Sequence, residues 1–259
     1  MIDRLTGFAD LGHRLLDETD RVALARYRDG ARARRKPDRT WVTDADVEVE
    51  RLLRERLSSA APDHGVEGEE LGSTLPHAEW RWILDPIDGT HSFMRGIDVW
   101  ATLIGLVRGG TPVVGLASAP AMGIRWWAVA GVGAFRRRDG EDRPIGVSSV
   151  DRLDETQLLH GGVHALDGGV ANAARHVWRD RGYGDFWGHM LVAEGAAEAM
   201  VEDGVSPWDM AAPCAIVTAA GGRMTDLTGR TSWTEPRLLT SNGLVHDELL
   251  ELLAGDPNA

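Results

Sequence analysis

Two segments near the start of the chain carry apolar residues every three or four positions, the spacing of amphipathic helices. The first runs from residue 3 to about 28 and places Leu5, Phe8 and Leu15 on one face. The second begins at Thr43, where the sequence TDAD offers a side-chain cap with Asp46 three residues later. An arginine-rich stretch, residues 28 to 39, lies between them. We expect it to be an exposed connector that ends near Lys36, a weak candidate for the functional site.

The middle of the chain alternates bulky apolar and polar residues, a pattern that predicts strands. Trp80 to Leu84 form one such strand, and we expect Pro86 to end it by holding Asp85 in an extended conformation. Further runs cover residues 99–107, 113–119, 125–129 and 133–137. Because only short turns separate these runs, they predict an antiparallel meander with one buried face.

The pattern of predicted elements changes near residue 140, from successive strands to helices that alternate with short strands. Helical patterns cover residues 169–181, 189–200 and 209–220, and short apolar runs cover residues 157–159, 197–201 and 238–240. The polar segment GEDRPIG, starting at residue 140, separates this α/β texture from the meander. We therefore predict an α+β half at residues 1–145 and an α/β half at residues 146–259, packed together as one structural unit.

Composition excludes several classes of protein. The 259 residues are 43% hydrophobic, enough for a sizeable core, and 40 acidic against 28 basic residues give a net charge of -12. This sign argues against a general nucleic-acid surface. Cys214 is the single cysteine, so an internal disulfide and a cysteine-based zinc site are excluded. No apolar run approaches the roughly 18 residues of a membrane span, so we expect a cytoplasmic protein with no membrane partner.

The candidate chemistry begins with DPIDGT, which directly follows the strand at Trp80. Asp85 and Asp88 flank a two-residue gap, so one small loop carries both carboxylates. Gly89 permits tight backbone geometry, and we expect Thr90 to cap a short helix over residues 92–95 whose first N–H groups face an anion. This loop belongs to the first half of the chain. Two acids beside an anion site indicate a cation between them.

Other acids lie at the ends of predicted elements. Glu69 and Glu70 follow Gly68 in a loop, and Asp209 starts an alanine-rich helix. Each has an ordinary alternative: solvated loop acids for the glutamates, and helix capping for Asp209. If these acids converge, oxygen-only ligands favour Mg²⁺ over Mn²⁺ or Ca²⁺, and over zinc. A pair of Mg²⁺ ions binds both the attacking water and the leaving oxygen of a phosphate ester.

Four motifs occur in a fixed order along the chain: TDAD, GEE, DPIDGT and WDMAAPCAIVTAAGG. In this order they resemble the inositol monophosphatase family of Mg²⁺-dependent, lithium-sensitive phosphatases, over nearly the whole chain from Leu5 to Leu253. The resemblance implies an α/β (α+β) fold, a layered α-β-α-β-α sandwich of the inositol monophosphatase and sugar phosphatase type. It also implies a homodimer, and two or three Mg²⁺ ions for which Mn²⁺ can substitute.

The resemblance also assigns roles to individual residues. It implies metal ligation by Glu69, Asp85, the carbonyl of Ile87, Asp88 and Asp209. Glu69 and Thr90 would orient the attacking water, and Asp46 would support the site from behind. Gly89 and Thr90 would hold the phosphate through backbone N–H groups.

Within the family, RWWA, YGDF and the closing TSNGLVHDELL are similar to the histidinol-phosphate phosphatase branch of actinobacteria. This implies hydrolysis of L-histidinol phosphate, a step of histidine biosynthesis. The substrate carries an ammonium and an imidazole, so its pocket should offer carboxylates. Asp44, Asp185 and Glu202 are the candidates, with Asn242 assisting, and for each the alternative is an ordinary surface or capping residue.

One departure from the family pattern follows DGT. The family commonly has any one residue and then Asn-Phe there, whereas this chain has His91, Ser92 and Phe93. It affects the detail of the loop, and we expect His91 to be exposed and not required as a base. Inositol-1-phosphate or broader sugar-phosphate hydrolysis therefore stays open as an alternative. A non-catalytic binding or regulatory protein on this scaffold is a further one, disfavoured because each matched metal position retains its acid.

Overall fold

The computed structural model describes residues 1–37, 40–161 and 168–254. These residues form layers of helices packed against an eight-stranded and a five-stranded sheet, with a two-stranded sheet of β1 (Ala33–Arg35) and β2 (Trp41–Thr43) beside them. The helices are α1 (Ile2–Asp29), α2 (Asp44–Ala60), α3 (Thr90–Arg95), the short 3₁₀ helix η1 (Leu153–Glu155), α4 (Gly168–Ala174), α5 (Asp185–Ala193), α6 (Pro207–Ala219) and α7 (His246–Leu253). The strands are β1 (Ala33–Arg35), β2 (Trp41–Thr43), β3 (Gly65–Gly68), β4 (Gly72–Thr74), β5 (Trp80–Asp88), β6 (Ala101–Arg108), β7 (Thr111–Ala119), β8 (Ile124–Val129), β9 (Gly133–Arg138), β10 (Glu141–Ile145), β11 (Gln157–His160), β12 (Arg179–Gly182), β13 (Ala199–Asp203), β14 (Arg223–Asp226) and β15 (Arg237–Ser241).

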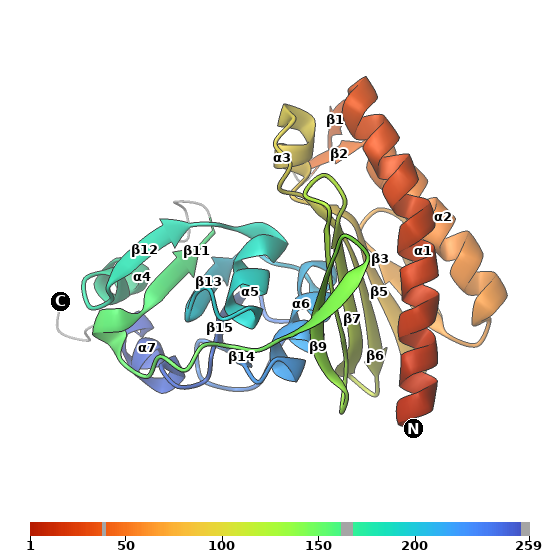
Figure 1. Cartoon of the computed structure of the whole chain (residues 1–259). Helices are drawn as coiled ribbons and strands as arrows, with labels where there is room; N and C mark the ends of the chain where they lie inside the picture. The colour runs from red at the N-terminus through yellow and green to blue at the C-terminus, as the bar shows by residue number, and fades with distance from the viewer. Residues whose placement is uncertain (38–39, 162–167, 255–259) are drawn as a thin grey trace.

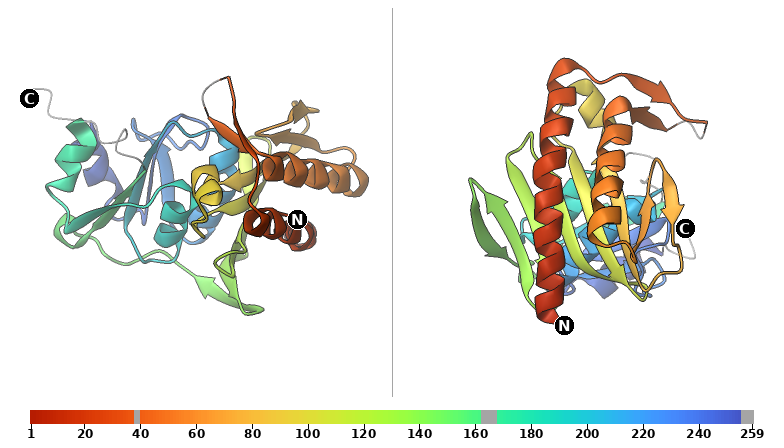
Figure 2. Two further views of the ribbon diagram at one scale, coloured as in Figure 1. Left: turned by 90° about the horizontal axis from the view of Figure 1, so that it is seen from above. Right: turned by 90° about the vertical axis from the view of Figure 1, so that its right-hand side faces the viewer.

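The elements stack in five layers, as Figure 1 shows. Helices α1 and α2 lie side by side over one face of an eight-stranded sheet with the order β10-β9-β8-β7-β6-β5-β3-β4 (Figure 2, right). Helices α5 and α6 fill the space between this sheet and a five-stranded sheet with the order β12-β11-β13-β15-β14. Helices α4 and α7 form the last layer. This α-β-α-β-α order confirms the fold class expected from the sequence.

Strands β5 to β10 form the expected antiparallel meander, with one strand more than the sequence indicates. The polar segment expected to separate the halves contains β10, which pairs with β9. The change from one sheet to the other falls between β10 and β11, close to residue 145. The division of the chain into two halves there stays a prediction.

Two helix predictions in the second half extend too far. Helix α4 ends at Ala174, and the expected helical residues 179–181 belong to β12, an edge strand parallel to β11. Helix α5 starts earlier than expected, at Asp185, and ends at Ala193. Gly195, with φ of 72°, ends this segment, and the chain then enters β13. A left-handed glycine therefore marks the end of the α5 segment, whereas pairing with β11 accounts for the strand at residues 179–182.

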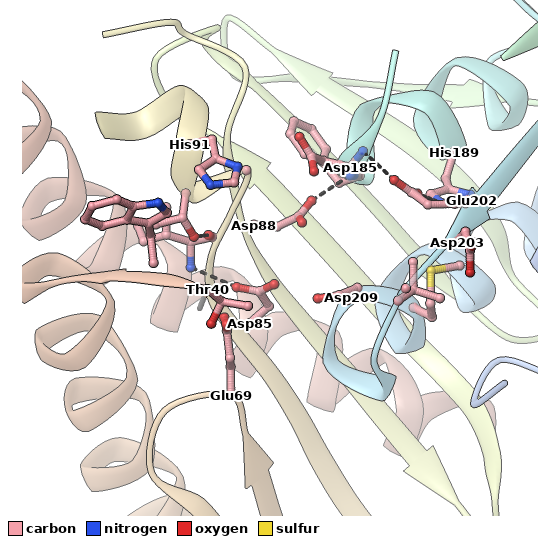
Figure 3. Close-up of a pocket in the computed structure, with 18 residues that line it drawn as sticks. Thr40, Glu69, Asp85, Asp88, His91, Asp185, His189, Glu202, Asp203 and Asp209 are labelled. Atoms are coloured by element: carbon pink, nitrogen blue, oxygen red, sulfur yellow. Dashed lines mark hydrogen bonds and ion pairs between the residues drawn. The ribbon is translucent and has the colours of Figure 1, made fainter. Parts of the chain in front are cut away.

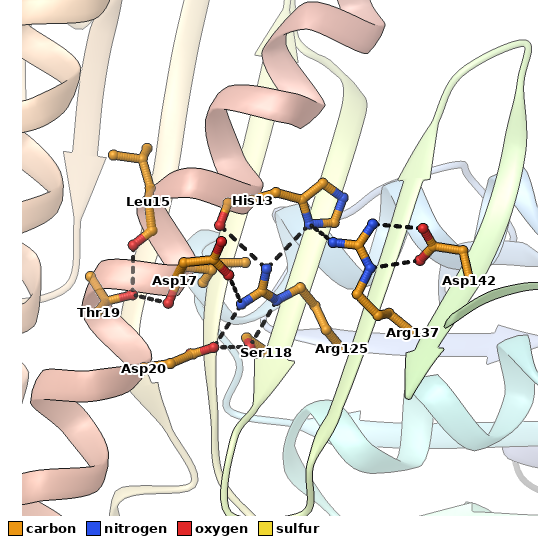
Figure 4. A network of polar contacts seen from close by, with 10 residues as sticks. His13, Leu15, Asp17, Thr19, Asp20, Ser118, Arg125, Arg137 and Asp142 are labelled. Carbon is orange, nitrogen blue, oxygen red and sulfur yellow. Dashed lines mark hydrogen bonds and ion pairs between the residues drawn. The ribbon is translucent and has the colours of Figure 1, made fainter. Parts of the chain in front are cut away.

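Helix α1 is fixed to the eight-stranded sheet by a buried arginine. Arg125 of β8 contacts Asp17 and Asp20 of α1 at 2.9 and 2.7 Å, and its Nε donates to Ser118 Oγ of β7 (Figure 4). The same guanidinium donates to the carbonyl of His13. On the other face α6 approaches β6 and β7 closely, because Gly105 and Gly115 have no side chain to keep the helix away. A Cβ on Gly115 would lie 2.5 Å from the carbonyl oxygen of Ala212.

Among the described residues, no helix combines the length and the apolar content that a membrane crossing needs.

Candidate metal and phosphate site

The site is built around the end of β5, where the strand is longer than the sequence suggests. β5 does not stop at Asp85 but continues to Asp88, with an irregular register against β6 between these two residues. Pro86 lies within this bulge, a position where strands tolerate proline. Its carbonyl accepts a hydrogen bond from Thr102 Oγ1 of β6 at 2.8 Å. The bulge turns both carboxylates toward one cavity, which a regular strand cannot do because its side chains alternate.

The turn after β5 also differs in detail from the expectation. Gly89, with φ of 80°, is the N-cap of α3, and Thr90 is the first residue of the helix. Thr90 Oγ1 donates to the carbonyl of Ile87 at 3.0 Å. A Cβ on Gly89 would lie 2.9 Å from the carbonyl oxygen of Val99, so both the dihedral angle and the space require glycine. Thr90 therefore stabilises the turn from within and does not cap α3.

Three carboxylates converge at this turn from two distant parts of the chain. Asp85 and Asp88 come from β5, and Asp209 comes from the first turn of α6 (Figure 3). Each offers an oxygen, and these oxygens all lie within 4.8 Å of one another. We call Asp85, Asp88 and Asp209 the acid cluster. Capping also holds Asp209, whose Oδ2 accepts from the backbone N–H of Ser206 at 2.7 Å. Both of the roles considered for Asp209 are thus compatible with its position.

A second group of acids lies next to the first. Oxygens of Asp46, Glu69 and Glu70 lie within 4.8 Å of one another. Asp46 is buried in the capping box of α2, where its Oδ2 accepts from the backbone N–H of Thr43 at 2.8 Å. Lys36 lies 2.8 Å from Glu69 Oε1 and 2.5 Å from Glu70 Oε1. Lys36, at the end of the arginine-rich connector, thus lies beside these acids, consistent with its selection as a candidate residue.

Burial makes this concentration of negative charge costly. It raises the pKa of Asp209 to about 6, and it raises the pKa values of Asp85 and Asp88 well above their usual range, with neighbouring carboxylates adding to the effect. Burial also raises the pKa of Glu69 to about 7, despite the nearby Lys36. Groups in this position either hold protons or share a cation.

The acid cluster lines a cavity of about 230 Å³. Its lining includes all the predicted metal and phosphate residues of the chain: Glu69, Asp85, Ile87, Asp88, Gly89, Thr90 and Asp209. The lining also includes Asp185 of α5 and Glu202 of β13, two of the predicted substrate residues, next to the acid cluster (Figure 3). His91 is exposed, as expected, and also lines the cavity.

The other two predicted substrate residues are not among those that line the cavity. Asp44 accepts from the backbone N–H of Arg32 at 3.0 Å and lines a different surface hollow. Asn242 is buried, and its side chain donates to the carbonyl of Val150 and accepts from the backbone N–H of Leu244. These bonds join the loop of Asn242 to the segment near residue 150, so Asn242 has a structural role at its position.

Sequence reasoning missed His189, which lines the cavity beside Glu202. Its Nε2 lies 2.9 Å from Glu202 Oε2 and its Nδ1 lies 3.0 Å from Thr240 Oγ1. A lone histidine in the sequence FWGHML resembles a core residue of a buried helix. Its spacing from Asp185, four residues along α5, was the only available signal.

Comparison with known proteins gives consistent results. A model of the inositol monophosphatase family matches residues 14–256. The chain is 43% identical over 256 residues to a histidinol-phosphatase of Streptomyces coelicolor, covering 94% of this chain and 95% of that one. It is 44% identical over 252 residues to a histidinol-phosphatase of Mycobacterium tuberculosis, covering 92% and 95%. A solved inositol monophosphatase from Anabaena superimposes with a TM-score of 0.85 at 26% identity, covering 98% of each chain.

Proposed function

The chain belongs to the inositol monophosphatase family, and from this premise we propose that it is a magnesium-dependent phosphomonoesterase that hydrolyses L-histidinol phosphate to L-histidinol and phosphate. The observation that carries the proposal is the cavity lined by two adjacent groups of acids. The acid cluster forms one part of the lining, and Asp185 with Glu202 forms an adjacent part. The first suits metal ions and the second suits a cationic substrate. The high identity to two histidinol-phosphatases supports the choice of substrate.

The donor set fits magnesium. The candidate ligands Glu69, Asp85, Asp88 and Asp209 offer only carboxylate oxygens, and the carbonyl of Ile87 adds another oxygen. Hard divalent cations prefer such ligands, and the raised pKa values reflect a charge that a cation would balance. Two or three Mg²⁺ ions, or Mn²⁺ as a substitute, belong to this proposal. When bound, magnesium supplies a Lewis acid that activates water and stabilises the leaving oxygen.

The side chains of the chain itself perform the remaining tasks. Glu69 and Thr90 orient the attacking water, and the hydrogen bond of Thr90 Oγ1 to Ile87 keeps its hydroxyl at the turn. The backbone N–H groups of Gly89 and Thr90 bind the phosphoryl oxygens. Asp46, held by Thr43, supports Glu69 from behind. The water attacks phosphorus in line with the leaving alcohol, and no phosphoenzyme forms.

Asp185 and Glu202 recognise the rest of the substrate. Histidinol phosphate carries an ammonium and an imidazole, both of which donate hydrogen bonds. Asp185 and Glu202 accept these bonds, and their charge favours the cationic groups. Inositol-1-phosphate, the second candidate, offers only hydroxyl groups and gains less from two carboxylates. The similarity to the Anabaena inositol monophosphatase keeps it as the runner-up.

Phosphate release from a panel of monoesters tests the proposal. The panel contains histidinol phosphate, inositol 1-phosphate, fructose 1,6-bisphosphate and adenosine 3′,5′-bisphosphate, each with Mg²⁺. We expect the highest kcat/KM for histidinol phosphate. Little preference for this compound would refute the substrate, and no phosphatase activity on any compound would favour the non-catalytic alternative.

Homodimer formation is also part of the proposal, since the resemblance to the family implies it. Light scattering on the purified protein should give twice the mass of one chain. The cytoplasmic location stays a prediction from the sequence.

A further inference from the structure

Glu202 is held at both of its oxygens. It lies near the end of β13, and its Oε1 accepts from the backbone N–H of Asp185 at 2.9 Å. Its Oε2 lies 2.9 Å from His189 Nε2 (Figure 3). Because an ionised carboxylate only accepts hydrogen bonds, Nε2 is the protonated nitrogen of the ring. Glu202 therefore has a fixed direction relative to the cavity.

His189 is in turn fixed by the five-stranded sheet. Its side chain is 1% exposed, and Nδ1 lies 3.0 Å from the hydroxyl of Thr240 on β15. Thr240 is fully buried and pairs with Met200 of β13, two residues before Glu202. These two contacts fix the orientation of the ring between β13 and β15.

Glu202 in turn orients Asp185 through a hydrogen bond to its backbone. Asp185 has φ of 56°, a left-handed conformation that costs a non-glycine residue roughly 1 kcal/mol or more. The bond from its N–H to Glu202 stabilises this conformation. Its carboxylate then lies close to the turn that binds phosphate in the proposed function, since a Cβ on Gly89 would be 3.6 Å from Asp185 Oδ2.

We infer that His189 is a positioning residue for substrate specificity. It holds Glu202, and through Glu202 it holds Asp185, so that the two carboxylates face the cationic part of a phosphate monoester. This role rests on the proposed function, and it adds a residue that touches neither the metal ligands nor the reacting phosphate.

Two substrates separate this role from a general structural one. Histidinol phosphate uses Asp185 and Glu202, whereas p-nitrophenyl phosphate has no cationic group and uses only the metal and phosphate side. We expect His189→Leu to lower kcat/KM for histidinol phosphate about tenfold or more, mainly through KM, since hydrogen bonds to charged groups are among the stronger ones. The kcat/KM for p-nitrophenyl phosphate should change by less than about twofold.

Two further variants keep the test decisive if His189→Leu does not fold. His189→Gln restores an N–H donor near the position of Nε2 and should recover most of the lost kcat/KM. Thr240→Val removes the partner of Nδ1 and should give a smaller loss in the same direction. The matched control is His176→Leu, because His176 is exposed and is hydrogen bonded within its own segment, to the carbonyl of Asn172.

Amide hydrogen exchange supplies a readout that needs no substrate. The amide of Asp185 should exchange faster in His189→Leu than in the wild type and in His176→Leu. Unchanged exchange, or equal kinetic losses on both substrates, overturns the positioning role. If the wild type shows no preference for histidinol phosphate, the proposed substrate fails, while the exchange rates still decide whether His189 holds Glu202 and Asp185.

Discussion

Two groups of charged side chains in this molecule differ in whether their negative charges are paired with positive ones. The acid cluster has three carboxylates of one sign, and burial raises their pKa values. The second group, the Arg125 network, consists of His13, Asp17, Asp20, Ser118, Arg125, Arg137 and Asp142 (Figure 4). There each acid contacts an arginine: the bond from Arg137 lowers the pKa of Asp142, and although burial raises the pKa of Asp20, the charge of Arg125 offsets part of this effect. The paired group holds elements together, whereas the unpaired group is suited to bind something from outside.

The largest effect expected from this comparison concerns activity. Asp88→Asn removes a charge from the acid cluster but keeps an oxygen that can accept from the backbone N–H of Phe186. We expect turnover to fall more than about a thousandfold, because a metal ligand is lost. The fold should persist, and without metal the variant should be at least as stable as the wild type. Phosphate release and urea unfolding in EDTA measure the two quantities, and retained activity would refute the shared mechanism.

The opposite result is expected in the Arg125 network. Arg125→Met removes the cation between Asp17 and Asp20 and leaves the partly buried Asp20 with Ser118 as its remaining partner among the described residues. We expect a loss of about 3 kcal/mol in the free energy of unfolding, the lower end for a broken buried pair because Asp17 is exposed. The kcat of the folded fraction should stay within about twofold of the wild type. A loss of activity without a loss of stability would contradict the division into functional and structural charge.

Magnesium itself should affect the two groups differently. A ligand that binds only the native state at one hundred times its Kd stabilises it by about 2.7 kcal/mol. We expect Mg²⁺ to stabilise the wild type and Arg125→Met by similar amounts, and Asp88→Asn far less. Thermal unfolding with increasing Mg²⁺ measures this, and equal stabilisation of all three proteins would place the metal elsewhere.

The smallest effect is a difference in pH dependence without metal. The pKa of Asp209 is raised to about 6, so the native state binds its proton more tightly than the unfolded state. This contribution to stability is lost as pH rises from about 4 to 6. Burial lowers the pKa of His13 from 6.5 to about 4, so the stability tied to neutral His13 is lost as pH falls through that range. In EDTA, the free energy of unfolding of Asp209→Asn should increase relative to the wild type as pH rises from about 4 to 6. That of His13→Gln should increase relative to the wild type as pH falls from about 6.5 to 4. Parallel slopes of the two variants would contradict the comparison.

The sequence predicted the elements that local patterns control. The cap at Thr43, the helix at Asp209 and the strands after Trp80 all follow from residue spacing and turn chemistry. The convergence of Asp85 with Asp209 did not follow from spacing, because long-range packing of α6 on the sheet creates it. The resemblance to a family supplied that convergence in advance.

Other features were decided by contacts that no local pattern reports. β5 continues past Pro86 because Asp88 pairs with Ala101 of β6, beside the bond of Thr102 to the Pro86 carbonyl. The position of Asn242 depends on loops near residue 150 with which its side chain bonds. His189 looked like a core residue because its partner Thr240 lies 51 residues away in the chain. Pairwise partners of buried polar groups are thus the part of a site that a single sequence conceals.

The close approach of α6 to Gly105 and Gly115 has a consequence for the order of synthesis. Until the ribosome has passed residue 219, the face of the eight-stranded sheet that α6 covers has no helix to pack against. The nascent meander then exposes an apolar surface that a chaperone can shield or that another chain can join. The same helix brings Asp209 to the acid cluster, so docking of α6 closes the core and completes the candidate site in a single event.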